Sequence, residues 1–175
     1  MLLSAKNVFE DGLHIGYNES MISENDYKTI VSNGYPKKGD VLLCCVGTIG
    51  RTCVYGYDEA MAFQRSDIFM RPSKEILSDY LCYALRTEAT ECQETLLVNK
   101  TAQDGLYMGA AREIIITIPS TIDEQNAIVS FLDEKCTQID SILESKQKQL
   151  ETITEHKKSL IYEYVTGKKR VKEVQ

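Results

Sequence analysis

Apolar residues in the last third of the chain recur at alternating steps of three and four residues. The seam that they form contains Val129, Leu132, Cys136, Ile139, Leu143, Leu150, Ile153, Leu160 and Tyr164, with lysines at the two remaining positions, 146 and 157. The apolar stripe is therefore only about two residues wide over roughly five heptads, which is typical of a coiled coil rather than of a helix packed on a globular core. A lysine in such a seam lowers stability and often specifies register or partner.

Both limits of this helix are marked in the sequence. Thr121 stands three residues before Glu124, which is a capping-box pattern, and Gly167 can adopt the left-handed conformation that ends a helix. Neither Gly nor Pro occurs between these limits. The pattern predicts one helix of about 45 residues, roughly 65 Å long. We expect it to pair with another helix, because folding back onto its own domain would leave most of so long a stripe uncovered.

The residues before the long helix alternate between strand and helix patterns. Strands are predicted over 2–9, 13–15, 41–46, 53–55, 62–70 and 113–118, a short helix from Ser23, a helix over 78–94 capped by Ser78, and a loop over 99–109. Asp11-Gly12 between the first two strands is a hairpin signal. The order predicts an α+β fold: a globular domain of mixed strands and short helices over 1–119, a long coiled-coil helix over 120–167 and a basic tail over 168–175.

A glycine-rich segment, Gly47-Thr48-Ile49-Gly50-Arg51, follows the strand over 41–46. A phosphate-binding loop needs four residues between its glycines and Lys-Ser/Thr after the second. Here two residues separate the glycines and an arginine follows. We interpret the segment as a tight turn between strands that presents Thr48 and Arg51 at a loop tip.

Composition narrows the class of protein. The chain has no run of 18 apolar residues and no signal-peptide pattern, so we expect no membrane segment and a cytoplasmic location. In that compartment the six cysteines are interpreted as reduced thiols of the core, and none has the spacing of a zinc knuckle. The adjacent Cys44 and Cys45 should point to opposite faces of their strand. We expect neither a metal nor a cofactor.

Charge bears on binding to nucleic acid. The formal net charge is −6, and residues 1–119 carry 11 Lys and Arg against 16 Asp and Glu, while residues 120–175 carry 9 against 10. Proteins that hold DNA by phosphate contacts alone are usually basic. If the chain contacts DNA, we therefore expect another subunit to supply much of the positive charge.

Several segments together resemble a known family. They are Gly39-Asp40-Val41-Leu42-Leu43, Val46-Gly47-Thr48-Ile49-Gly50-Arg51, Ile118-Pro119, Glu124-Gln125, Ser159-Leu160-Ile161 and Val165-Thr166-Gly167-Lys168. In this order and spacing they are similar to a target recognition domain and long helix of the DNA specificity subunit of type I restriction-modification systems. The resemblance covers nearly the whole chain.

The resemblance implies a non-catalytic subunit that binds double-stranded DNA. In that family each recognition domain reads half of a split target, and long helices space two such domains and dock methyltransferase subunits, with a restriction subunit as a further partner. The two helices lie antiparallel, which implies an antiparallel homodimer or pairing with a second specificity chain. Since this chain has one domain and one helix, it is interpreted as a half subunit or fragment.

Candidate base readers are hydrogen-bonding or charged side chains in or beside the predicted turns. They are Lys6, Asn7, Thr48, Arg51, Gln64, Arg65, Asn99, Lys100 and Gln103.

Two other classes of function remain open on the sequence alone. One is a small enzyme that uses Cys44 or Cys45 with His14 or His156, although neither histidine lies in a catalytic motif. The other is a coiled-coil adaptor or structural protein that does not bind DNA.

Overall fold

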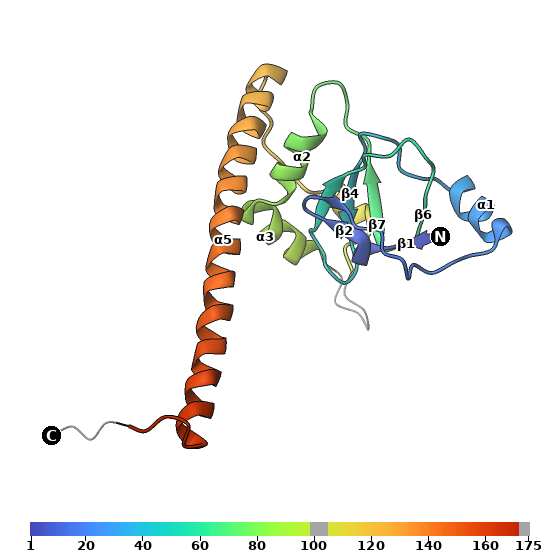
Figure 1. Ribbon diagram of the computed structural model, residues 1–175. Helices are drawn as coiled ribbons and strands as arrows, with labels where there is room; N and C mark the ends of the chain where they lie inside the picture. The colour runs from blue at the N-terminus through green and yellow to red at the C-terminus, as the bar shows by residue number, and fades with distance from the viewer. Residues whose placement is uncertain (99–104, 172–175) are drawn as a thin grey trace. The chain divides into compact units, whose positions relative to one another are not determined.

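The computed structural model describes residues 1–98 and 105–171 and has the α+β fold that the sequence predicts (Figure 1). Its strands are β1 (Leu2–Leu3), β2 (Val8–Phe9), β3 (Gly12–Leu13), β4 (Val41–Cys44), β5 (Thr52–Val54), β6 (Ala62–Phe63) and β7 (Asp67–Met70). Its helices are the 3-10 turn η1 (Ala5–Asn7), α1 (Glu24–Ser32), α2 (Ser78–Leu85), α3 (Glu88–Leu97), α4 (Met108–Ala111) and α5 (Ile122–Val165). The chain divides into two compact units, Met1–Val129 and Ser130–Gln175.

Strand β4 is the centre of the first unit. It pairs antiparallel with β5 on one side and with β7 on the other, and all four of its residues are buried. Leu42 and Cys44 point to one face of the sheet, while Val41 and Leu43 belong to clusters on the other. Cys45 joins the second face, so the prediction that Cys44 and Cys45 diverge is confirmed.

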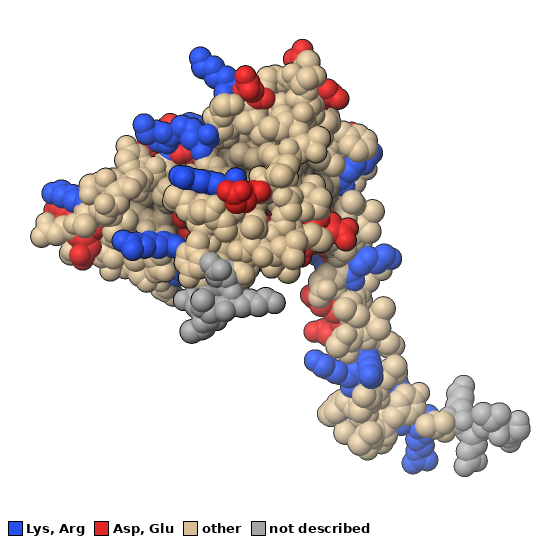
Figure 2. All heavy atoms as spheres, turned by 180° about the vertical axis from the view of Figure 1, so that it is seen from behind, with Lys and Arg blue, Asp and Glu red and all other residues tan. Residues whose placement is uncertain are grey.

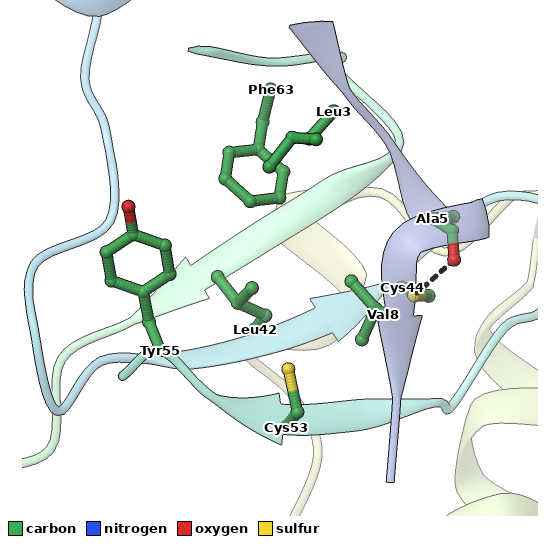
Figure 3. Close-up of a cluster of buried hydrophobic side chains, with 8 residues drawn as sticks. All are labelled: Leu3, Ala5, Val8, Leu42, Cys44, Cys53, Tyr55 and Phe63. Atoms are coloured by element: carbon green, nitrogen blue, oxygen red, sulfur yellow. Dashed lines mark hydrogen bonds between the residues drawn. The ribbon is translucent and has the colours of Figure 1, made fainter. Parts of the chain in front are cut away.

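The two faces of the sheet are covered by different parts of the chain. On one face, residues from the N-terminal segment pack on β4 and β5, and the cluster is Leu3, Ala5, Val8, Leu42, Cys44, Cys53, Tyr55 and Phe63 (Figure 3). The Cys44 thiol donates to the carbonyl oxygen of Ala5 at 3.7 Å. On the other face, the apolar side of α2 packs against Val41.

Two predicted strands are each divided in the structure, because their halves have different partners. The segment 62–70 first pairs in parallel with β1 as β6, then turns at Gln64 and Arg65 and pairs with β4 as β7. The segment 2–9 is broken by η1, where the backbone N–H of Ser4 donates to Oδ1 of Asn7 at 3.0 Å. The hairpin at Asp11-Gly12 is confirmed, with a return strand shorter than predicted.

The prediction of one helix over 78–94 is wrong, because the structure has two helices, α2 and α3, in this region. Helix α2 ends at Leu85, and the hydroxyl oxygen of Thr87 then accepts from the backbone N–H of Thr90 at 3.4 Å to cap α3. Ser78 is not the cap of α2. Its hydroxyl donates to the carbonyl oxygen of Gly39 at 2.6 Å and ties the helix to the start of β4. Ser23, by contrast, caps α1 as predicted.

The predicted strand over 113–118 is also wrong. The carboxamide of Gln93 takes the place of a neighbouring strand: its Nε2 donates to the carbonyl of Ile115 at 2.9 Å, and its Oε1 accepts from the N–H of Ile115 at 2.8 Å. The segment joins no sheet within the described residues. Within the predicted loop 99–109, a short helix, α4, begins at Met108.

The long helix is confirmed. Helix α5 runs for 44 residues, and the hydroxyl of Thr121 accepts from the N–H of Glu124 at 3.2 Å at its start. Gly167 has a φ of +75° at its end. Gln125 anchors the first turn, since its fully buried carboxamide accepts from the N–H of Leu77 at 2.9 Å and donates to the carbonyl of Glu75 at 2.8 Å. None of the helices in the described part of the chain is long and apolar enough to cross a membrane.

Candidate functional site

The segment between β4 and β5 is a tight turn, as the sequence predicts. Gly47 and Gly50 have φ values of +82° and +86°, which side-chain-bearing residues rarely adopt. The N–H of Gly50 donates to the carbonyl of Cys44 at 3.1 Å, and the N–H of Cys44 donates to that of Arg51 at 2.9 Å. The turn closes the hairpin and leaves Thr48 exposed at its tip.

Arg51 is only partly exposed, because it is held against the N-terminal hairpin. Its Nη1 donates to the carbonyl of Val8 at 3.2 Å, and its guanidinium lies 4.9 Å from the ring centroid of Phe9. The ring of Phe9 is in turn stacked with that of His14 at 4.3 Å. His14 is therefore a surface residue of the hairpin, paired with Asp11 at 2.9 Å.

Gln64 and Arg65 are exposed in the turn between β6 and β7. They border a groove of about 780 Å³ whose walls include Ile30 of α1, Phe69 of β7 and Tyr107. Within the described part of the chain, Arg65 forms no ion pair. Its guanidinium is therefore available to an external acceptor.

Lys6 and Asn7 are engaged inside the protein. Asn7 is 2% exposed, and its Nδ2 donates to the carbonyl of His14 at 3.0 Å and to Oε1 of Glu19 at 2.7 Å. The exposed ammonium of Lys6 lies 2.8 Å from Oε2 of Glu19. Because its amide is buried and already bonded, Asn7 is poorly placed to read a base.

The structure does not bring the predicted readers into one patch. Thr48 and Arg51 border one cavity, Gln64 and Arg65 border the groove, and neither set of lining residues includes a member of the other pair. The remaining candidates, Asn99, Lys100 and Gln103, lie outside the described residues.

Sequence reasoning missed Glu94 and Arg86, which line the cavity of about 300 Å³ beside Thr48 and Arg51. Arg86 donates through Nη2 to the carbonyls of Thr52 at 2.7 Å and Glu10 at 2.8 Å. The sequence pattern places both residues on a single helix. No periodic signal distinguishes them from solvated helix residues.

Burial disfavours the thiolate form of the core cysteines. Burial raises the pKa of Cys44, and it raises the pKa of Cys45 and Cys53 to about 12 and that of Cys82 to about 11. A thiol that stays protonated is a poor nucleophile, which argues against the enzyme interpretation. The prediction that all six are core residues is wrong for Cys92 and Cys136, which are exposed. No group of three or more His, Cys, Asp or Glu in the described residues could hold a metal.

The charged surface is mixed. Figure 2 shows Lys and Arg side chains interspersed with Asp and Glu over the face that it displays. Several cations are matched by carboxylates, including Lys38 with Asp58 at 2.9 Å and Arg71 with Asp40 at 2.8 Å. This pairing lowers the positive potential that a phosphate backbone would meet.

The apolar seam of α5 is exposed over most of its length. Leu143, Leu150 and Ile153 are 60%, 58% and 66% exposed, and Ile139 is 55% exposed. Further along, Leu160 and Tyr164 are also exposed, as is Cys136. Only Val129 and Leu132, near the start of the helix, are partly buried.

Comparison with known proteins identifies relatives of the chain. Residues 6–155 match the family described as the type I restriction modification DNA specificity domain. A type I restriction enzyme specificity subunit of Haemophilus influenzae is 34% identical over 110 residues, which make up 62% of this chain and 27% of that protein. The chain therefore spans about a quarter of the length of this curated relative.

Two solved structures are also similar. One is a chain from a structure that describes complex assembly and conformational transition of the type I R-M system. It has a TM-score of 0.49 and is 24% identical, and the match covers 70% of this chain and 28% of that one. The S subunit of a type I restriction-modification system from M. genitalium has a TM-score of 0.46 and 18% identity, over 83% of this chain and 38% of that one. Because the family match runs from η1 through most of α5, the chain belongs to the type I restriction modification DNA specificity domain family.

Proposed function

We propose that the chain is a DNA-reading module of a type I restriction-modification complex. Its globular unit recognises one half of a bipartite target, and its long helix docks methyltransferase subunits. The observation that carries this proposal is the extent of the family match, which includes both the globular unit and most of α5. A match confined to the globular unit would not have favoured a role for the helix.

The best-supported readers are the exposed side chains at turns, Thr48, Gln64 and Arg65. Arg51 donates through one edge of its guanidinium to the carbonyl of Val8, and its other edge contacts the DNA. Lys6 contacts phosphate if its pair with Glu19 opens. Asn7 supports the fold around the readers rather than reading bases, and Asn99, Lys100 and Gln103 remain candidates on the sequence alone.

The exposed seam of α5 supports the second half of the proposal. An exposed seam of aliphatic side chains has a free-energy gain of roughly 25 cal/mol for each Å² of apolar surface that a partner covers. We propose that an equivalent helix of a second specificity chain covers it, either antiparallel in a homodimer or in a heteromeric pair, and that methyltransferase subunits bind the paired helices.

Partner dependence is the central test. In a mobility-shift titration at fixed salt, we expect the chain alone to bind DNA weakly, because a net charge of −6 gives little counterion release. The mixture with a methyltransferase subunit should bind its target tightly and methylate it, whereas the methyltransferase alone should not. Tight sequence-specific binding by the chain alone would remove the dependence, and a mixture that binds no target would favour the adaptor interpretation.

A single substitution tests the readers. Changing Arg65 to Ala should weaken binding of the assembled complex to its target by about 1–3 kcal/mol, the usual value of a good base contact. The melting temperature should not move, since Arg65 is exposed and forms no ion pair within the described residues. Lys74→Ala, at another exposed cation, is the matched control. Equal target affinity for the variant and the unmodified complex would remove Arg65 from the readers.

A further inference from the structure

Glu94 is a carboxyl group buried without a full set of partners. It lies on α3, is 4% exposed, and its Oε1 has no hydrogen-bond partner within the described residues. A buried carboxylate that is neither paired nor hydrogen-bonded has a high free energy, and such a group usually stays neutral instead. The family match gives this residue no role.

The carboxyl lies directly against the turn between β4 and β5. A Cβ atom built on Gly50 would be 2.5 Å from Oε2 of Glu94, which is closer than real atoms approach. Gly50 also has the positive φ of +86° that the turn requires. The positive φ favours glycine here, and any side chain at this position would also have to displace the carboxyl of Glu94.

The charged groups around Glu94 do not neutralise it. Those lining the same cavity are Glu10 of the β2–β3 turn, Arg51, Arg86 at the end of α2, and Glu91 one turn before Glu94. Arg51 and Arg86 donate to backbone carbonyls of other segments. Burial first, and the nearby carboxylate of Glu91 second, raise the pKa of Glu94 to about 7.

We propose that Glu94 is a positioning residue that makes the β4–β5 turn, and through it the DNA contact of Thr48 and Arg51, respond to pH. Uncharged, the carboxyl packs beneath Gly50 and holds the turn closed. Ionised, it turns toward water or toward the arginines of the cavity that it lines with Gly50, and in doing so it leaves its place beneath the turn. The DNA part of this proposal rests on the proposed function, whereas the movement of the turn does not.

The direction of the effect follows from charge. A new negative charge beneath the turn repels phosphate, and displacement of the turn moves Thr48 and Arg51 from their packed positions. Both effects weaken DNA binding as pH rises through neutrality. A glutamine at position 94 has nearly the same shape and cannot ionise, so it should keep the turn closed at all pH values.

The movement of the turn is tested on the chain without DNA. In ¹⁵N-resolved NMR spectra from about pH 5.5 to 8.5, the amide of Gly50 should titrate with a midpoint near neutrality. The titration should be lost in Glu94→Gln. It should persist in the matched control Glu91→Gln, with a lower midpoint, because one repulsive charge is gone. A Gly50 amide that does not titrate, or that titrates equally in Glu94→Gln, would overturn the proposal.

The consequence for DNA is tested on the complex with the methyltransferase subunit. Between pH 6 and pH 8 at fixed salt, the affinity for the target should fall about fivefold or more, and in Glu94→Gln it should stay near its value at pH 6. Equal pH profiles would overturn the link from Glu94 to DNA. If the complex binds no target at any pH, the proposed function fails, while the Gly50 titration still decides the movement of the turn.

Discussion

At the scale of residues, the buried polar side chains have specific hydrogen-bond partners, and Asp40 is an example. Asp40 is 3% exposed, and its carboxylate accepts from Nε of Arg71 at 2.9 Å and from Nη2 at 2.8 Å. The backbone N–H of Lys37 donates to it as well, at 2.8 Å. Burial alone would raise the pKa of Asp40, but these hydrogen bonds outweigh it and the pKa lies below its usual value.

Replacing Arg71 with Met should destabilise the protein at pH 7 by about 1–3 kcal/mol, because the buried carboxylate of Asp40 loses two of its donors. A lowered pKa contributes stability that is present above the unfolded pKa, about 3.9, and is lost as pH falls through the folded value. The deficit of the variant should therefore shrink in acid. Urea denaturation at pH 7 and pH 3 measures it, with Lys74→Met at an exposed site as the control. A deficit that does not change with pH would show that Asp40 is not the group involved.

Glu94 should have the opposite pH dependence. Its pKa is raised, so the stability contributed by the neutral carboxyl is fully present below the unfolded pKa of about 4.3 and is lost as pH rises through 7. Glu94→Gln should match the unmodified protein at pH 4 and exceed it by about 3–4 kcal/mol at pH 8, because a pKa difference of one is worth about 1.4 kcal/mol. Thermal unfolding across this range tests the expectation, and parallel curves for the two proteins would contradict it.

At the scale of elements, short side-chain contacts decide where helices and strands end. Thr87 begins α3, Gln93 holds the segment around Ile115, and Gln125 fixes the first turn of α5 on the start of α2. The long helix itself depends less on such contacts. Its length follows from 44 residues without Gly or Pro, and most of its apolar seam is exposed.

Replacing both Leu143 and Leu150 with Glu should convert an associated chain into monomers, because two charges would enter the apolar seam. Analytical ultracentrifugation at tens of micromolar measures the change. Ser145→Glu with Thr152→Glu adds the same charge outside the seam and should leave association intact. If the unmodified chain is itself monomeric at this concentration, α5 pairs with a different specificity chain rather than with its own copy.

At the scale of the whole molecule, charge bears on the proposed binding to DNA. Neither the residues before position 120 nor those after it are net basic, so counterion release would give this chain little affinity of its own for DNA. Pairing through α5 would join two recognition domains. Once one domain is bound, the other would bind its half of the target at a high effective concentration.

A homodimer should prefer an inverted repeat with a fixed spacer, because the two-fold symmetry of the protein is mirrored in the site. Selection from a random DNA library with the assembled complex, followed by sequencing, tests this. Insertion of a few base pairs into the spacer should abolish binding, while substitution within the spacer should not. Selected sites with two unrelated halves would instead indicate a heteromeric pair of specificity chains.

The sequence alone was sufficient for features that local chemistry controls. A 3-4 seam bounded by a capping threonine and a glycine predicted α5, because helix periodicity and end signals act within a few residues. The buried strand β4, the hairpin at Gly12 and the turn at Gly47 and Gly50 were predictable for the same reason. The order of these segments also carried the resemblance to the family.

Only the tertiary structure decided features that depend on residues distant in sequence. The strand predicted over 62–70 divides because one half pairs with β1 and the other with β4, and Ser78 bonds to Gly39 instead of capping its helix. Asn7 is a plausible reader in sequence, but its amide is used by His14 and Glu19. Glu94 looks like any solvated helix residue until the fold places it beneath Gly50. The burial of a side chain and its hydrogen-bond partners are properties of the folded chain. No local sequence pattern encodes which distant group a given side chain will contact.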